Sequence, residues 1–263
     1  MNSLRQFLLA LGAFLLFGLF LECPDGATKP SNDSDTIVVP EGWELVWHDE
    51  FDGGEVDTAN WAIVQRENSW NSELQYYVRE DVYIENGCLR LRSQKRTFGS
   101  KNYTSGLVYT QYKFYFKYGR FEIRAKLPYG KGMWPAHWML PNDGDWPPEI
   151  DIMENLGHQR NIIYMTNHYT EVGQRRSSGG YYTSNFDFSA DFHTYAVEWE
   201  ADSIRWYIDG VRRFVSTKGV PQEYFYIILN TAVGGDWPGS PDATTVFPQY
   251  HDIDYVRVFQ RKR

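Results

Sequence analysis

The sequence is poor in cysteine, which limits the ways in which the chain can be cross-linked. Its 263 residues include only Cys23 and Cys88, too few for the framework of several disulfides found in small secreted domains. Cys23 directly follows an apolar N-terminal stretch, so we expect Cys88 to serve as a small hydrophobic side chain. The sequence also lacks a cluster of His and Cys at metal-ligand spacing, and it gives no support for a metal or other cofactor in catalysis.

Basic charge is also in short supply. The chain has 26 Lys and Arg against 34 Asp and Glu, a formal net charge of -8, and a pI near 5.3. This balance argues against nucleic acids and anionic membranes as partners. It also weighs against strongly sulfated or acidic polysaccharides, unless a local basic pocket overrides it. Nothing in the sequence implies a protein partner, so we expect a monomer.

No convincing amphipathic helix appears after Gly42. Short runs of β-forming residues alternate there with turn pairs such as Asn86-Gly87 and Asp209-Gly210. The runs are residues 43–47, 82–84, 113–117, 120–127, 195–199, 204–208, 225–230 and 253–259. This spacing predicts an all-β fold, a two-sheet β-sandwich of the jelly-roll type, formed as one domain by residues 41–261.

The N-terminal segment resembles a targeting signal. Residues 1–22 read as a secretory signal peptide, with Arg5 as the basic start and an apolar stretch over residues 7–20. Residues 23–40 are rich in Pro, Ser and Asp and predict a flexible lead. We therefore expect a secreted, extracellular protein. Attachment of a lipid to Cys23 is an alternative, although Glu22 stands where a small residue is expected.

Aromatic residues, in contrast, are abundant. They make up 17% of the chain, with 10 Trp and 19 Tyr. Aromatic faces stack on the apolar faces of sugar rings, so this excess fits a carbohydrate-binding protein. Ordinary core packing accounts for many of these residues as well.

The most informative stretch of the sequence is a short acidic strand. Acidic and apolar residues alternate from Glu149 to Ile152, as in a strand with one wet and one buried face. Strict alternation would bury Glu154, at a high cost in free energy. One extra residue at Met153, a β-bulge, would return Glu154 to the face that carries Glu149 and Asp151.

Three carboxylates on one face of a strand destabilise it, because each raises the pKa of its neighbours. Catalysis offers a reason to keep them, since a pair of carboxyls in unlike environments can cleave a glycosidic bond. The Cα atoms of Glu149 and Glu154 would lie roughly 13 Å apart, so their side chains could bring the carboxyls to about 5–5.5 Å, the separation found in retaining glycosidases. The alternative is a solvated edge strand whose acids deter aggregation.

Several motifs in fixed order make the chain similar to glycoside hydrolase family 16, in its laminarinase-like branch. The motifs lie at residues 47–53, 71–77, 118–122, 134–138, 149–154, 191–195, 228–235 and 254–258. The resemblance implies a β-jelly roll with a concave substrate cleft and retaining hydrolysis of internal β-glycosidic bonds in β-1,3-glucan or mixed-linkage β-1,3-1,4-glucan. It implies Glu149 as the nucleophile, Glu154 as the general acid/base and Asp151 as the residue between them.

The resemblance also implies residues that contact the sugar chain. They are Asn71, Arg124, Trp134, Trp138, Trp146, His168, Asn230 and Trp237. Each has a plainer alternative. One or two of the four Trp would be core residues, the two Asn would cap turns, Arg124 would form a cross-strand salt bridge, and His168 would be a core histidine.

Family members often hold a structural Ca²⁺ on their convex side. The resemblance places Asp254 as its side-chain ligand, with Glu50 and Gly87 as donors of carbonyl oxygens, and hard oxygen ligands suit Ca²⁺. Other functions also stay open at this point. They are hydrolysis of a galactan such as agar or carrageenan, transglycosylation, and glucan binding without catalysis on the same fold.

Overall fold

The computed structural model describes residues 37–67, 70–144 and 146–262. The predicted signal peptide and nearly all of the predicted lead lie outside these residues. Within them the chain forms strands, two short 3₁₀ helices, η1 (Trp70–Ser72) and η2 (Arg79–Asp81), and no α-helix. No helix in the described part is long and apolar enough to span a bilayer.

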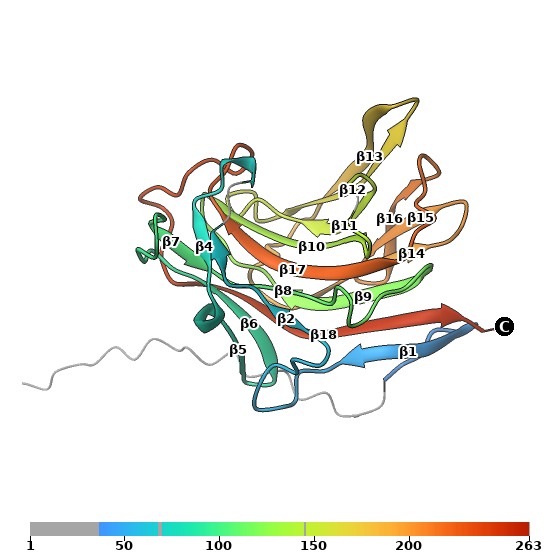
Figure 1. Cartoon of the computed structure of the whole chain (residues 1–263), viewed down its shortest axis with the longest axis horizontal. Helices are drawn as coiled ribbons and strands as arrows, with labels where there is room; N and C mark the ends of the chain where they lie inside the picture. The colour runs from blue at the N-terminus through green and yellow to red at the C-terminus, as the bar shows by residue number, and fades with distance from the viewer. Residues whose placement is uncertain (1–36, 68–69, 145, 263) are drawn as a thin grey trace, which may run out of the picture.

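The strands form two large sheets and one small sheet (Figure 1). The eight-stranded sheet has the order β16-β15-β14-β9-β18-β6-β5, and β1 also pairs with β18. Its strands are β1 (Trp43–Asp49), β5 (Val82–Glu85), β6 (Cys88–Ser93), β9 (Gly119–Lys126), β14 (His193–Trp199), β15 (Ile204–Ile208), β16 (Val211–Ser216) and β18 (Gln249–Arg261).

The seven-stranded sheet has the order β13-β12-β11-β10-β17-β8-β2. Its strands are β2 (Ala62–Ile63), β8 (Leu107–Tyr109), β10 (Met133–Pro141), β11 (Glu149–Glu154), β12 (Ile162–Glu171), β13 (Gln174–Thr183) and β17 (Phe225–Val233). A three-stranded sheet consists of β3 (Arg66–Glu67), β4 (Gln75–Tyr77) and β7 (Tyr103–Ser105). Figure 1 shows this small sheet beside one end of β17, and the β12–β13 hairpin projecting from the body.

The main hydrophobic core fills the space between the two large sheets. Phe121 and Ile123 of β9 and Val197 of β14 enter it from the eight-stranded sheet, while Ile150 of β11 and Leu229 of β17 enter it from the other sheet. Strand β12 shows why the sequence folds this way, because its residues alternate between buried and partly exposed from 162 to 169. The predicted all-β jelly-roll sandwich is confirmed.

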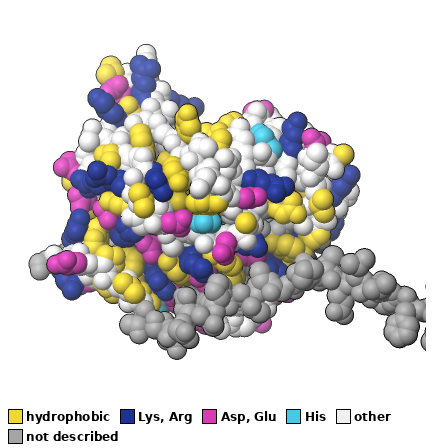
Figure 2. Space-filling view, turned by 180° about the vertical axis from the view of Figure 1, so that it is seen from behind, with side chains coloured by type: hydrophobic (Ala, Val, Ile, Leu, Met, Phe, Trp, Pro, Cys, Tyr) yellow, Lys and Arg dark blue, Asp and Glu magenta, His cyan; other side chains and the backbone are white. Residues whose placement is uncertain are grey.

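The outer face of the seven-stranded sheet is not simply a solvated surface. All nine residues of β17 are buried, because Tyr226 and Ile228 pack on this outer face in a second hydrophobic cluster with Tyr77 and Leu107. Figure 2 shows the side of the molecule opposite to that in Figure 1. On this side, Lys and Arg lie among Asp and Glu. In that view dark blue side chains also lie on the projecting hairpin, whose β13 strand carries Arg175 and Arg176.

A pair of histidines lies buried in the interior. His137 of β10 and His251 of β18 are fully buried, and their Nε2 atoms are 3.0 Å apart. Burial lowers the pKa of His251 to about 3 and lowers the pKa of His137 well below its usual value, to which the neighbouring His251 also contributes. Both rings are therefore neutral in the folded protein.

This pair predicts a loss of stability in acid. A histidine with a lowered pKa binds its proton in the unfolded chain near pH 6.5 but not in the fold, so the free energy of unfolding falls as the pH drops from about 6.5 toward 3, by about 1.4 kcal/mol per pH unit for each ring. Chemical denaturation at several pH values should show that His251→Asn loses about half of the slope due to the pair. The exposed control His158→Gln should keep the wild-type slope. An unchanged slope in His251→Asn would refute the assignment.

Candidate active site

Strand β11 contains the predicted β-bulge. In its pairing with β12, Asp151 lies opposite Thr166 and Glu154 lies opposite Tyr164, so two residues of β11 face one residue of β12 between them. Both of those residues, Ile152 and Met153, are buried in the core. The irregular backbone is supported across the core, where Trp206 Nε1 of β15 donates a hydrogen bond of 2.8 Å to the Asp151 carbonyl oxygen. The bulge is confirmed, and it returns Glu154 to the acidic face.

Glu149 begins β11 among polar contacts. Trp146 Nε1 donates a hydrogen bond of 2.7 Å to Glu149 Oε2, and His168 Nε2 lies 4.0 Å from Glu149 Oε1. Burial raises the pKa of Glu149 well above its usual value, and the charge of Asp151 raises it further. The His168 and Trp146 contacts oppose these effects and favour the carboxylate.

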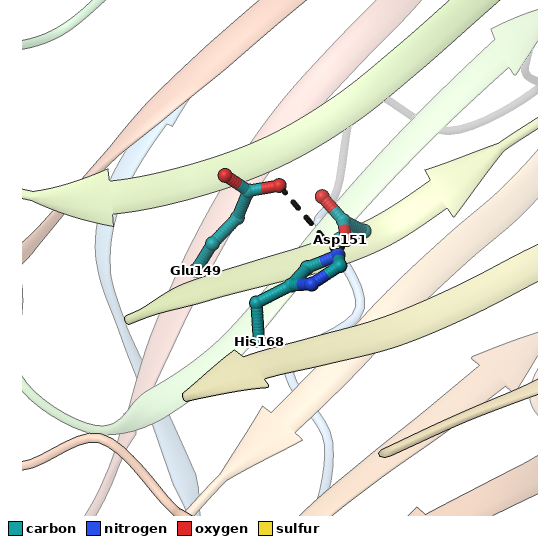
Figure 3. Close-up of side chains that lie close together, drawn as sticks. All are labelled: Glu149, Asp151 and His168. Atoms are coloured by element: carbon teal, nitrogen blue, oxygen red, sulfur yellow. Dashed lines mark ion pairs between the residues drawn. The ribbon is translucent and has the colours of Figure 1, made fainter. Parts of the chain in front are cut away.

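Asp151 lies between the two glutamates and is almost fully buried. Its Oδ2 is 3.2 Å from His168 Nε2, and Figure 3 shows the two side chains beside Glu149. Burial, with the charge of Glu154 as the second cause, raises the pKa of Asp151 well above its usual value. A hydrogen bond between Asp151 and Glu149 raises the pKa of Glu149 and lowers that of Asp151, so these two carboxyls are suited to share a proton.

Glu154 ends β11 on the same face. Trp134 Nε1 of β10 donates a hydrogen bond of 3.0 Å to Glu154 Oε1. The residue is partly exposed at the surface, yet protein surrounds the carboxyl closely, and the resulting loss of hydration, with the charge of Glu149, raises its pKa to about 8. His168 faces Glu149 and Asp151 rather than Glu154. The His168 contact therefore favours negative charge on the Glu149–Asp151 pair, while burial favours the protonated form of Glu154.

The four predicted tryptophans all lie at this face. Trp134 and Trp138 are partly exposed, while Trp146 and Trp237 are exposed. The rings of Trp134 and Trp237 meet edge to face with centroids 5.5 Å apart. β10 places both of its tryptophans on the outer side of the sheet, where Trp138 also packs against the second hydrophobic cluster, so the alternative of a core role applies in part to Trp138.

Asn230 is buried and Asn71 is exposed, and both form hydrogen bonds within the protein. Asn230 accepts a hydrogen bond of 2.8 Å from Trp138 Nε1 and donates one of 3.0 Å to the Tyr77 hydroxyl. Asn71 donates a longer hydrogen bond to Glu73, and its carbonyl oxygen accepts one from the backbone N–H of Asp236. Both residues therefore hold neighbouring side chains or loops in place through these hydrogen bonds.

Arg124 is not part of this site, and the prediction that it contacts the sugar chain is wrong. It lies on β9 in the eight-stranded sheet, where its neighbours Ile123 and Ala125 point into the core. Its side chain therefore points away from β11. Arg124 Nη1 pairs with Asp254 Oδ2 at 2.5 Å, which is the cross-strand salt bridge considered as its alternative.

The residues predicted to bind calcium have cationic neighbours in the structure. Asp254, fully buried on β18, has Arg124 as its partner. The Glu50 carboxylate accepts two hydrogen bonds from Arg257, of 2.9 and 2.8 Å, and Gly87 lies between β5 and β6. A calcium ion at Asp254 would share that carboxylate with the Arg124 guanidinium, and the carbonyl oxygens of Glu50 and Gly87 stay its predicted further ligands.

Two aromatic residues at this face were missed from the sequence. Tyr164 lies opposite Glu154 in the sheet and packs on Trp237 with centroids 4.8 Å apart. Tyr226 of β17 has its pKa raised to about 12, chiefly by burial and in smaller part by Glu149. The alternation of β12 could have placed Tyr164 on the outer face, whereas β17 is buried throughout and shows no alternation that would place Tyr226.

Known proteins share this arrangement of sheets. The model for "Glycosyl hydrolases family 16" matches residues 70–257. A β-glucanase of Rhodothermus marinus is 37% identical over 249 residues, which cover 83% of this chain and 85% of the relative. A glucan endo-1,3-beta-glucosidase A1 of Niallia circulans is 36% identical, and the match covers 84% of this chain and 38% of that longer protein.

Among solved structures, the laminarinase catalytic domain from Thermotoga maritima MSB8 is 42% identical and superposes with a TM-score of 0.78. The match covers 85% of this chain and 100% of that domain. The fold, the sequence identity and the coverage all indicate the same family. The chain belongs to glycosyl hydrolases family 16.

Proposed function

We propose that the protein is a retaining endo-glycosidase that hydrolyses internal β-glucosidic bonds of β-1,3-glucan, of mixed-linkage β-1,3-1,4-glucan, or of both. The observation that carries the proposal is the bulged strand β11, on which Glu149, Asp151 and Glu154 share one face with unlike electrostatic surroundings. The β-glucanase and endo-1,3-beta-glucosidase relatives support the choice of substrate.

In the first step Glu149 attacks the anomeric carbon. The indole N–H of Trp146 fixes one of its carboxylate oxygens, which leaves the other to form the bond. The proton shared with Asp151 must stay on Asp151 for Glu149 to be the nucleophile, and the nearby His168 favours negative charge on this pair. Glu154 at the same time donates its proton to the departing glycosidic oxygen, a role that suits a pKa near 8.

In the second step Glu154, now ionised, takes a proton from water. The water attacks the anomeric carbon, the ester bond to Glu149 breaks, and Glu149 is released as a carboxylate. Two inversions at the same carbon give net retention. Trp134, hydrogen-bonded to Glu154, keeps the carboxyl oriented during both proton transfers.

Reducing-sugar release on laminarin, lichenan, agarose and carrageenan side by side tests the proposal. We expect release from laminarin or lichenan at a rate at least about tenfold above that from either galactan, because the Rhodothermus marinus β-glucanase and the Thermotoga maritima laminarinase domain match over 85% and 100% of their own lengths. Release only from agarose or carrageenan would overturn the substrate. Glucan binding without release would favour a binding module, and products longer than the substrate would favour a transglycosylase.

We also propose that the protein acts outside the cell. The apolar N-terminal stretch of the sequence supports secretion, and an extracellular, monomeric enzyme suits a polysaccharide that cannot enter the cell. A structural Ca²⁺ at Asp254, Glu50 and Gly87 stays a prediction, and no step of the mechanism depends on it.

A further inference from the structure

Three tyrosines stand exposed on neighbouring loops beside the acidic face. Tyr112 and Tyr115 lie between β8 and β9, and Tyr224 directly precedes β17. Their exposed fractions are 72%, 46% and 57%. The rings of Tyr115 and Tyr224 meet edge to face with centroids 5.9 Å apart. We call these three residues the tyrosine patch.

The patch is held in place by one asparagine, Asn142, at the start of the loop that leads to Glu149. The backbone N–H of Tyr112 donates to Asn142 Oδ1 at 2.9 Å, and the backbone N–H of Asn142 donates to the carbonyl oxygen of Tyr224 at 2.7 Å. Gln111 Nε2 donates to the Asn142 carbonyl oxygen at 3.2 Å. The two loops and the loop before the catalytic strand are therefore tied together, and the rings are presented from a fixed backbone.

The backbone at Tyr112 is strained. Its φ is 58°, in the left-handed region that glycine or asparagine adopts easily and a bulky side chain does not. Glycine at this position would remove the strain, and the exposed ring buries little surface in return. The tyrosine therefore costs folding stability at this position, as Val172 with its φ of 50° does at the tip of the β12–β13 hairpin, and the case for binding rests on the arrangement of the three rings.

The patch continues the acidic face. Tyr226, two residues after Tyr224, packs against Tyr109 with centroids 5.9 Å apart. It belongs to the same outer-face cluster as Trp138, which lies opposite Asp151 in the sheet. Lys113, the basic residue next to Tyr112, directs its Nζ to the carbonyl oxygen of Thr58. The surface offered to a ligand is aromatic and hydroxyl-bearing, which suits a neutral sugar chain rather than an anionic one.

We propose that the tyrosine patch is a binding platform for the same glucan chain, holding sugar units beyond those next to Glu149 and Glu154. Glucose rings would stack on the exposed faces of Tyr112 and Tyr224, and the phenol hydroxyls would bind sugar hydroxyls. The platform makes the enzyme favour long chains over short ones. This inference rests on the proposed function, because the occupant of the patch is the substrate itself.

Calorimetric binding in the Glu149→Gln background tests the platform without cleavage of the ligand. Tyr112→Ala and Tyr224→Ala should each weaken the binding of laminarioctaose by about three- to tenfold, the loss of one aromatic contact, and should change the binding of laminaritriose much less. The control Val172→Ala, at the exposed tip of the β12–β13 hairpin, should change neither. Equal loss for both ligands, or no loss, would overturn the platform.

Thermal unfolding separates the strain from the binding role. Tyr112→Gly should melt about 2–4 °C above Tyr112→Ala, since only the alanine keeps the left-handed strain, while both variants should bind the octasaccharide equally weakly. Full octasaccharide binding by both would reduce Tyr112 to a structural residue and refute the inference. Failure of the proposed function looks different, because then wild-type protein neither releases reducing sugar from glucans nor binds either oligosaccharide in the Glu149→Gln background.

Discussion

Replacement of Glu149 by Gln is expected to abolish glucan hydrolysis, with kcat reduced by a factor on the order of 10⁴ or more, because an amide cannot form the covalent bond to the anomeric carbon. Initial rates of reducing-sugar release on laminarin and lichenan measure the loss. The change is nearly isosteric, so the hydrogen bond from Trp146 can pass to the amide oxygen, and KM or binding affinity should change little.

The fold of Glu149→Gln should be at least as stable as that of the wild-type chain. The pKa of Glu149 is raised in the fold, so the wild-type carboxyl ionises earlier in the unfolded chain, and the free energy of unfolding falls as the pH rises above about 4.5. A neutral Gln does not have this loss, and its melting temperature at pH 7 should equal or exceed that of the wild type. Glu171→Gln, at the exposed end of β12, is the matched control and should keep full activity. More than about one hundredth of wild-type kcat in Glu149→Gln would refute the nucleophile assignment.

The acidic strand could be predicted from the sequence because charge and burial make incompatible demands on it. Alternation fixes the faces of Glu149 and Asp151, and the cost of burying Glu154 leaves a bulge as the remaining solution. The structure places the extra residue within the Ile152–Met153 pair, both of which turn into the core. The support for this bulge could not be predicted, since Trp206 reaches Asp151 from the other sheet, 55 residues away in the chain.

Arg124 illustrates the opposite limit. Alternation correctly places it on the polar face of its strand, but periodicity does not tell which of two sheets the strand joins. The structure puts β9 beside β18, so that Arg124 meets Asp254 instead of the substrate face. Arg124, predicted to contact sugar, and Asp254, predicted to bind calcium, are thus the two partners of one salt bridge.

Asn230 shows that hydrogen-bond partners far apart in the chain could not be predicted from the sequence. A polar residue at a strand edge suits sugar recognition, yet Trp138 and Tyr77 occupy its amide oxygen and nitrogen. Tyr77 lies 153 positions away in the chain, and no local pattern links the two. Similarly, the left-handed backbone of Tyr112 has no signature in the sequence, because the asparagine that holds it lies 30 residues away.

Glu154→Gln should distinguish the role of Glu154 from that of Glu149. The distinction comes from how the variant responds to an activated substrate and to azide, and not from how much activity it loses. The variant cannot donate a proton, so hydrolysis of laminarin should fall by about 10²–10⁴-fold. A 2,4-dinitrophenyl β-glucan oligoside has a leaving group that needs no proton and should still transfer its sugar to Glu149. Sodium azide should then accelerate turnover, because an anion that needs no general base can replace water in the second step.

The stereochemistry of the azide product identifies each glutamate. Attack on the glycosyl ester of Glu149 gives a β-glycosyl azide, which NMR distinguishes from the α-anomer, and Asp151→Asn as the control should show no rescue. If Glu154 were instead the nucleophile, its variant would yield the α-azide by direct displacement.

The pH profile of the enzyme provides independent evidence for the role of Glu154. Wild-type kcat/KM should fall above about pH 8 as Glu154 loses its proton, and this basic limb should be absent when Glu154→Gln acts on the activated substrate. A limb that persists there would assign the pKa near 8 to another group and refute the role of Glu154 as the acid.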